Sequence, residues 1–148
     1  MKNPLGTGKE RTMAVFQNAD ELYECIGGLF DWAKEDPEVA PKLIKTGLVI
    51  RLHYTLPDAV ISIDCRGKVD WKRGVTPDPA DVEFFMKGDI GHRFWLGKVS
   101  LLVALAKRDI TCKGALTKVM RILPILKPLY AQYPRLLEAK GKSALAAV

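Results

Sequence analysis

The sequence has no hydrophobic run long enough to cross a membrane. Its longest apolar stretch is Val99–Ala106 (VSLLVALA), which is less than half of the ~20 residues that a spanning helix needs. The beginning of the chain, Met1–Arg11, is polar, and no apolar segment follows it, so we expect no secretory signal. These absences predict a soluble protein of the cytoplasm.

Cysteine and histidine are scarce. The cysteines Cys25, Cys65 and Cys112 are odd in number and far apart, and no Cys-x-x-Cys motif occurs. This excludes a complete disulfide framework, so we expect free thiols. The two histidines, His53 and His92, have no further ligand at metal-binding spacing, so we predict no metal site. Nothing in the sequence indicates a catalytic residue or a bound cofactor.

The composition is that of one globular domain. The chain has 148 residues, of which 48% are apolar and 27% are charged, and these values argue against disorder. The net charge of +6 is unevenly distributed, because residues 1–106 carry −1 and residues 107–148 carry +7. A basic segment of this kind attracts nucleic acid, an anionic membrane or an anionic ligand head group, and the alternative is a solvated helix face.

Periodicity divides the chain into helices and strands. Apolar residues at helical spacing predict helices, strict alternation predicts strands, and Gly, Pro, Asn and Asp mark the ends. The expected helices are 19–35, 37–45, 89–96, 98–107 and 115–133, and the expected strands are 48–56, 59–66, 69–72, 81–87 and 109–114. The alternation in 48–56 predicts one buried face. Around a single domain of residues 18–134 we expect a flexible leader, 1–17, and a basic tail, 135–148.

Particular residues refine these elements. Gly27 and Gly28 in the first helix indicate close packing against another element. The helix 98–107 is apolar on nearly every face, so it is buried on all sides or lines an apolar space. Pro124 must kink or split the last helix, and Pro128 and Pro134 break it further. We expect a two-layer α+β sandwich, with an antiparallel sheet and the helices packed on one face.

Several short segments share their order and spacing with one protein family. They are Asp36-Pro37-Glu38, Gly47–Leu56, Val60–Gly67 with Lys68, Ala80–Phe84, Gly97–Leu101 and Ile110–Gly114. Over roughly residues 20–130, this pattern resembles the sterol carrier protein 2 family in its stand-alone prokaryotic form. Two features depart from it. Lys107-Arg108-Asp109 stands where the family often has a glycine, and the chain ends in Ala146-Ala147-Val148 instead of a peroxisomal tripeptide.

The resemblance implies both a fold and a function. The implied fold is α+β, with a five-stranded mixed, mostly antiparallel sheet, helices packed on one face, and an apolar tunnel between the two layers. The implied function is non-enzymatic binding or carriage of a fatty acid, an acyl-coenzyme A, a sterol or a phospholipid in that tunnel.

Without the resemblance, the residues themselves also favour an apolar ligand site, but less strongly than the resemblance does. Val99–Ala106 and Leu116–Tyr130 hold more apolar side chains than one core contact needs, and aromatic residues lie near them in the sequence. The candidate ligand-binding residues are Phe84, Met86, Phe94, Trp95, Leu101, Leu102, Leu105, Leu116, Met120, Leu123, Leu126 and Tyr130. The alternative is that these side chains simply fill the core.

Basic side chains flank the apolar set. Lys113, Lys118, Arg121 and Lys127 are candidates for holding a carboxylate or phosphate head group at the tunnel mouth. The alternative is an exposed surface face.

The apolar stretches and the basic side chains also predict other partners. The wide apolar arc of residues 115–130 is also typical of a homodimer interface, or of an accessory subunit of an enzyme of acyl-coenzyme A metabolism. The basic end favours a transient contact with a membrane surface. Nucleic acid is not favoured as a partner, because aromatic residues are not interleaved with the basic ones in a recognisable module.

Overall fold

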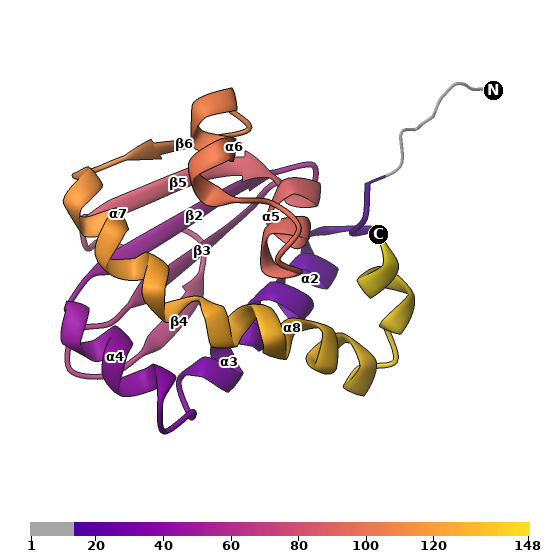
Figure 1. Cartoon of the computed structure of the whole chain (residues 1–148), viewed down its shortest axis with the longest axis horizontal. Helices are drawn as coiled ribbons and strands as arrows, with labels where there is room; N and C mark the ends of the chain where they lie inside the picture. Colours follow the sequence, from indigo (N-terminus) through magenta and orange to yellow (C-terminus); the bar gives the residue numbers. More distant parts are fainter. Residues whose placement is uncertain (1–13) are drawn as a thin grey trace.

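A five-stranded mixed sheet forms one layer of the structure, and helices cover one of its faces (Figure 1). The computed structural model describes residues 14–148, so most of the expected leader lies outside the described residues. The strands are β2 (Val49–Thr55), β3 (Ala59–Asp64), β4 (Asp70–Arg73), β5 (Val82–Lys87) and β6 (Ile110–Lys113). The predicted α+β class and the order of the elements are confirmed.

Strand β2 lies at the centre of the sheet, in the order β4-β3-β2-β5-β6. It pairs antiparallel with β3 and parallel with β5, whereas β3 and β4, and also β5 and β6, are antiparallel. A parallel pair needs a long connection, and here β3, β4 and the loop 74–81 supply it. The sheet is therefore mixed and mostly antiparallel, as the resemblance implies.

The outer face of β2, on the side away from the helices, is more buried than its alternation predicts. Arg51 is only 5% exposed. Its Nε donates to Ser62 Oγ at 2.9 Å, and its Nη2 donates to Thr76 Oγ1 and to the carbonyl oxygen of Asp78, both at 2.8 Å. These bonds hold the loop 74–80 over the sheet. The prediction of a half-buried strand is therefore wrong here, because a distant loop covers the polar face.

The expected helix 19–35 forms as three consecutive segments, α2 (Ala19–Leu22), the π-helical η1 (Tyr23–Gly27) and α3 (Gly28–Ala33). Asn18 caps the first of them, because its Oδ1 accepts from the backbone N–H of Glu21 at 2.9 Å. A side chain on Gly27 would collide with the indole of Trp71 on β4. The expected close packing at this glycine is confirmed.

The second helix, α4 (Val39–Thr46), begins and ends close to the predicted positions. Asp36 Oδ2 accepts from the backbone N–H of Val39 at 2.9 Å and so caps its first turn. Gly47 follows the helix with φ +62°, a left-handed conformation that favours glycine.

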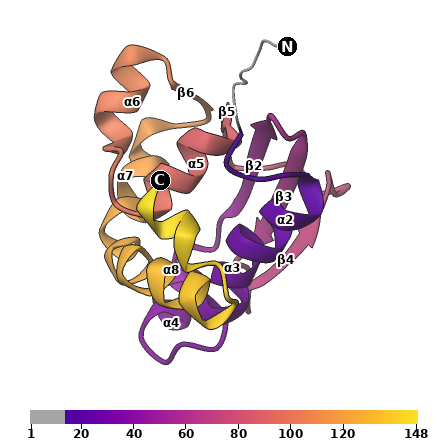
Figure 2. The same cartoon turned by 90° about the vertical axis from the view of Figure 1, so that its right-hand side faces the viewer.

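The second half of the chain supplies most of the helical layer. Its elements are α5 (Gly88–Trp95), α6 (Leu101–Lys107), α7 (Leu116–Ile122), the 3-10 helix η2 (Leu123–Ile125), α8 (Lys127–Ala139) and the 3-10 helix η3 (Ser143–Ala147). In Figure 1, α7 and α8 cross in front of the sheet, and Figure 2 shows α5, α7 and α8 on the same side of β2. None of the helices in the described part of the chain is long and apolar enough to span a membrane.

The prolines of the last helical region act differently from one another. At Pro124 the α-helix gives way to the 3-10 turn η2, and Pro128 lies in the first turn of the new helix α8, so both of these breaks are as predicted. Pro134 lies inside α8, which continues to Ala139, so the predicted break at this residue is wrong. Tyr133 and Leu137, on either side of it, are both fully buried, and their packing outweighs the ~3 kcal/mol that a proline inside a helix costs.

Helix α6 differs from expectation on its outer side. Leu101 and Ala104 are buried, whereas Leu102 and Val103 are about half exposed, so the helix is not buried on all sides. Arg108 ends the helix with φ +65°, near the position where the resemblance predicts a glycine.

Residues on both sides of the predicted domain pack against its core. Phe16 is 1% exposed, and α8 carries the buried Leu137 beyond the predicted boundary. The last segment is held by buried His92, whose Nε2 donates to the carbonyl oxygen of Leu145 at 2.7 Å. Because Nε2 carries the proton, Nδ1 accepts from the hydroxyl of Tyr133 at 2.8 Å. Burial lowers the pKa of His92 below its ordinary value of 6.5.

Candidate ligand-binding cavity

An apolar cavity lies between the sheet and the helices. The volume open to the centre of a water-sized sphere is about 50 Å³, whereas a single water needs about 10–15 Å³ on this measure. Its wall consists of Phe30, Leu43, Ile50, Leu52, Tyr54, Ile63, Phe84, Met86, Phe94, Trp95, Leu101, Ile110, Val119, Ile122, Leu126 and Leu129. All are apolar or aromatic, so the space suits an apolar guest.

The two central strands form the floor of the cavity. Ile50, Leu52 and Tyr54 are alternate residues of β2, so they share the face that the helices cover. Phe84 and Met86 extend this floor on β5, where they pair with Leu52 and Tyr54 in the parallel register. From Ile50 to Tyr54 the floor is roughly 13 Å long, at the ~3.3 Å rise of a strand residue.

The roof comes from the helices α3 to α8. α3 contributes Phe30, α4 Leu43, α5 Phe94 and Trp95, α6 Leu101, α7 Val119 and Ile122, and α8 Leu129, while Leu126 lies just before α8. These helices come from both ends of the described chain. The cavity therefore lies where they converge over the sheet, and no single helix defines it.

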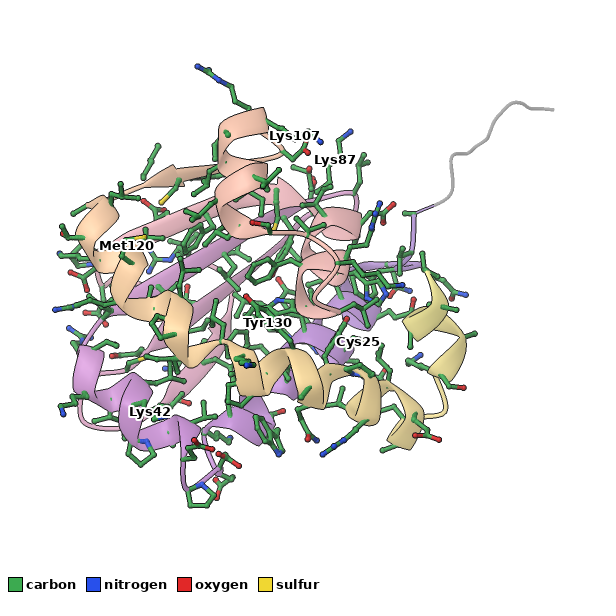
Figure 3. The ribbon with its side chains drawn as sticks, viewed as in Figure 1. Cys25, Lys42, Lys87, Lys107, Met120 and Tyr130 are labelled. Carbon is green, nitrogen blue, oxygen red and sulfur yellow. The ribbon has the colours of Figure 1, made fainter. Side chains whose placement is uncertain are left out.

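Aromatic rings pack edge to face between α3, α5 and α8. The ring centroids of Phe94 and Trp95 lie 4.9 Å apart, those of Phe94 and Tyr130 5.4 Å, and those of Phe30 and Trp95 5.6 Å. Figure 3 shows Tyr130 on α8, between the ribbons of α5 and α8. Such pairs stabilise beyond the area they bury, so this part of the wall is firmly packed.

One residue of the wall, Tyr54, carries a buried hydroxyl group. Tyr54 is 3% exposed, and its hydroxyl oxygen has almost no accessible surface, so its ring and not its hydroxyl lines the open space. Burial raises the pKa of this phenol well above its ordinary value, and hydrogen bonding from the indole N–H of Trp95 offsets part of that rise. The phenol therefore stays protonated and keeps a hydrogen to donate.

The structure brings half of the predicted ligand-binding residues together. Those in the cavity wall are Phe84, Met86, Phe94, Trp95, Leu101 and Leu126. Leu105, Leu123 and Tyr130 pack against the core as partly buried side chains outside the wall, whereas Leu102, Leu116 and Met120 are exposed. Figure 3 shows Met120 on α7, apart from Tyr130. Contact with a ligand stays a prediction for both groups.

Ten residues of the wall were not predicted from the sequence. They are Phe30, Leu43, Ile50, Leu52, Tyr54, Ile63, Ile110, Val119, Ile122 and Leu129. The alternation in the strands identifies the inward face of β2 and β3, and a search that followed this face would have found Ile50, Leu52 and Tyr54. Nothing in the spacing places Phe30 or Leu43 at the same cavity, because that depends on how the helices cross the sheet.

The basic head-group candidates lie in different surroundings. Lys118 and Arg121 lie on α7 next to the wall residues Val119 and Ile122. Lys118 Nζ lies 3.2 Å from Asp81 Oδ1, and Arg121 Nη2 donates at 3.2 Å to a backbone carbonyl at the end of α4.

The other two candidates, Lys113 and Lys127, lie on β6 and at the start of α8. Lys113 lies 5.3 Å from the ring centroid of Phe85, on the outer face of the sheet. Lys127 is an exposed residue at the start of α8. Lys127 nevertheless follows the wall residue Leu126 directly in the chain, so among the four candidates Lys113 alone lies on the other face of the sheet.

No family model and no curated protein matches the sequence. Solved structures do match the fold. Sterol carrier protein 2 from Yarrowia lipolytica, in its apo form, has a TM-score of 0.61 and 18% identity, over 80% of this chain and 98% of that chain. The sterol carrier protein domain 2 of Helicoverpa armigera has a TM-score of 0.63 and 14% identity, over 74% of this chain and 88% of that chain.

A third match, UbiJ-SCP2, is a ubiquinone synthesis protein. It has a TM-score of 0.55 and 12% identity, over 70% of this chain and 85% of that chain. Identities this low establish the fold alone. The chain therefore has the fold of sterol carrier protein 2, as its sequence pattern predicts.

Proposed function

We propose that the protein binds a lipid in this cavity and carries it without covalent chemistry. The observation that supports the proposal most directly is the apolar cavity between the sheet and the helices. Each methylene group that enters such a space contributes roughly 0.8 kcal/mol of transfer free energy. A fatty acid, an acyl-coenzyme A, a sterol and a phospholipid all have an apolar part that benefits from this burial.

A long ligand needs more room than the cavity now offers. Its volume of about 50 Å³ accommodates only a short piece of chain, so a lipid must displace side chains of the wall. Helix α6 contributes Leu101 to the wall and exposes apolar side chains on its outer side, where Leu102 and Val103 face solvent. Outward movement of α6, which packs mainly on β6, would admit the ligand.

An anionic head group fits best at the α7 end of the cavity. Lys118 and Arg121 adjoin the wall there, and each is held only by a surface contact. A carboxylate or phosphate would exchange these contacts for charge-assisted hydrogen bonds. Lys113 is left out of this proposal because it lies on the other face of the sheet.

Blocking the cavity tests the proposal. Val119 is 1% exposed and lines the cavity, so Val119→Phe places a ring in the space that the ligand needs. Val103→Phe makes the same chemical change on the exposed side of α6 and is the matched control. We expect saturable binding of a fluorescent fatty acid to the wild type and to Val103→Phe, and its loss in Val119→Phe. Equal binding by both variants would place the ligand elsewhere.

We further propose that the protein is not an enzyme and acts in the cytoplasm. The first statement is supported by the cavity wall, whose side chains include no carboxylate, imidazole, thiol or basic group. The second is supported by the free cysteines, since Cys25 and Cys65 are buried without a disulfide partner. Burial raises the pKa of these thiols to about 11 and about 12, so they are inert at neutral pH.

A membrane surface is the partner that we propose for loading and release. Helices α6 and α7 come directly before and after the edge strand β6 in the chain and lie near it in Figure 1. Together they expose Leu102, Val103, Leu116 and Met120. Residues 98–127 include seven basic side chains and one acidic side chain. Exposed apolar side chains among basic ones are typical of contact with an anionic bilayer.

Vesicle flotation separates this partner from the alternatives. We expect the protein to float with vesicles that contain phosphatidylserine, less so at high salt, and not with pure phosphatidylcholine. Leu102→Ser combined with Met120→Ser should abolish flotation. If the protein binds neither kind of vesicle but sediments as a dimer, the result would instead favour a homodimer or an accessory subunit. The same exposed side chains would then form the protein–protein interface.

A further inference from the structure

The floor of the cavity has two defined ends. Ile50 and Tyr54 on β2 both line the cavity, and they lie roughly 13 Å apart at the ~3.3 Å rise of a strand residue. Ile63 pairs with Ile50 at one end, Met86 pairs with Tyr54 at the other, and both of these partners are wall residues as well. The cavity therefore extends along the whole of this length.

The Ile50 end lies next to charged side chains. One carboxylate oxygen of Asp81 accepts from the backbone N–H of Val49 at 2.8 Å, one residue before Ile50. Lys118 Nζ lies 3.2 Å from the other oxygen of the same carboxylate, and both side chains are partly exposed. This is the end at which we place an anionic head group. The apolar chain of such a ligand then points toward Tyr54.

The Tyr54 end is closed by the close approach of α5 to β2. A Cβ atom on Gly91 would lie 2.5 Å from Cε1 of Tyr54, so the ring packs where this helix has no side chain. A Cβ atom on Gly88 would lie 2.9 Å from the backbone oxygen of Leu56, so the helix begins directly against the end of the strand. The two glycines make this approach possible. The open space therefore ends at the ring of Tyr54, with the backbone of α5 behind it.

The distance between the two ends fixes the length of chain that fits. Three bonds of a fully extended chain advance ~3.5 Å, so ~13 Å corresponds to about eleven bonds, or about twelve carbon atoms. Flexible wall side chains such as Met86 can move aside for this chain, whereas the backbone behind Tyr54 cannot. A methylene group up to this length is buried, and one beyond it must fold back or stay in water.

We infer that the ring of Tyr54 is the stop that limits the buried acyl chain to about twelve carbon atoms. The preferred ligand is therefore a lipid with an acyl chain of medium length. This inference rests on the proposed lipid-binding function and on the head-group position proposed with it, and it narrows the class of lipid.

The test compares saturated fatty acids of increasing length. Octanoic, decanoic, dodecanoic, tetradecanoic and hexadecanoic acids each displace a fluorescent fatty acid, at concentrations too low for micelles. For the wild type we expect the affinity to rise roughly fourfold with each methylene group as far as dodecanoic acid. Between dodecanoic and hexadecanoic acid the affinity should change by less than about twofold, because the added groups are not buried.

Tyr54→Leu removes the ring and lengthens the open space. In this variant the affinity should go on rising as far as tetradecanoic or hexadecanoic acid. Tyr130→Leu is the matched control, because Tyr130 packs against Phe94 but is not in the cavity wall. In the control the plateau should stay at dodecanoic acid.

The outcomes separate the two proposals. If the affinity of the wild type rises steadily to hexadecanoic acid, or if the plateau of Tyr54→Leu stays at dodecanoic acid, the inference is wrong and the lipid-carrier proposal stands. Failure of the wild type to bind any of the acids would instead count against the lipid-carrier proposal itself.

A measurement on the wild type alone does not depend on the folding of a variant. Dodecanoic acid with an isotopically labelled terminal methyl group is bound to the protein and studied by NMR spectroscopy. We expect nuclear Overhauser contacts between this methyl group and the ring protons of Tyr54. Contacts of the methyl group with Val119 and not with Tyr54 would overturn the inference, because the chain would then end at the opposite end of the cavity.

Discussion

Truncating a leucine in the cavity wall tests where the ligand binds. Leu129 on α8 is fully buried and lines the cavity. Leu129→Ala removes the branched end of the side chain, and buried Leu-to-Ala changes cost about 3–5 kcal/mol. At about 3 °C per kcal/mol for a domain of this size, we expect the melting temperature to fall by roughly 10–15 °C.

The same change enlarges the space that a lipid enters. If the ligand fills part of the vacated volume, each additional buried methylene contributes about 0.8 kcal/mol. One or two such groups improve the affinity by about tenfold, since 1.4 kcal/mol corresponds to one decade. The lipid should therefore stabilise Leu129→Ala more than it stabilises the wild type.

Leu137→Ala is the matched control. Leu137 lies on the same helix and is equally buried, but it is not part of the cavity wall. We expect a similar loss of stability without any gain in affinity. Thermal unfolding with and without a saturating fatty acid provides the comparison. Equal ligand-induced shifts in the two leucine variants would refute the assignment of the cavity as the lipid site.

Three further changes test the packing described above. Burial lowers the pKa of His92, so the unfolded state binds its proton first, and stability should fall as the pH drops below about 6.5, by up to about 1.4 kcal/mol per pH unit. Urea titrations of the wild type and His92→Gln check this, because the variant should lack that component of the pH dependence. Arg108→Gly should stabilise by about 1 kcal/mol, since φ is +65° at this residue, and a lower urea midpoint would contradict it. Gly27→Ala should destabilise by about 1–3 kcal/mol, because its methyl group meets the Trp71 indole, whereas Gly28→Ala, which faces a flexible lysine chain, should be neutral or stabilising in the same titration.

The order of the elements could be predicted because each is encoded locally. The alternation of residues 48–56 marks a strand within one short segment. In the same way, Asp36 marks the start of α4 and Gly47 marks its end. The α+β class then follows from packing helices against a sheet of short strands. The resemblance implied a mixed sheet, but nothing in the sequence specified that β2 and β5 form its parallel pair, and the antiparallel sheet expected from the residues alone is wrong at this pair.

The cavity could be predicted only in part, because its wall combines residues that are distant in sequence. Six candidate residues lie in the wall, but Phe30 and Leu43 reach it from helices that carry no apolar excess. Arg51 illustrates the same limit on the outer face, where the loop 74–80 buries a charge that looks exposed in the sequence. Pro134 stays helical for a comparable reason, since the packing of α8 overrides a local helix breaker.

Native mass spectrometry of the freshly purified protein tests the central claim most directly. We predict a non-covalent adduct of one lipid per chain in the wild type, identified after extraction as a molecule with a long apolar part, and its absence from Val119→Phe. A wild type that carries no adduct, and takes up none when mixed with a fatty acid, would contradict the proposal that this cavity holds a lipid.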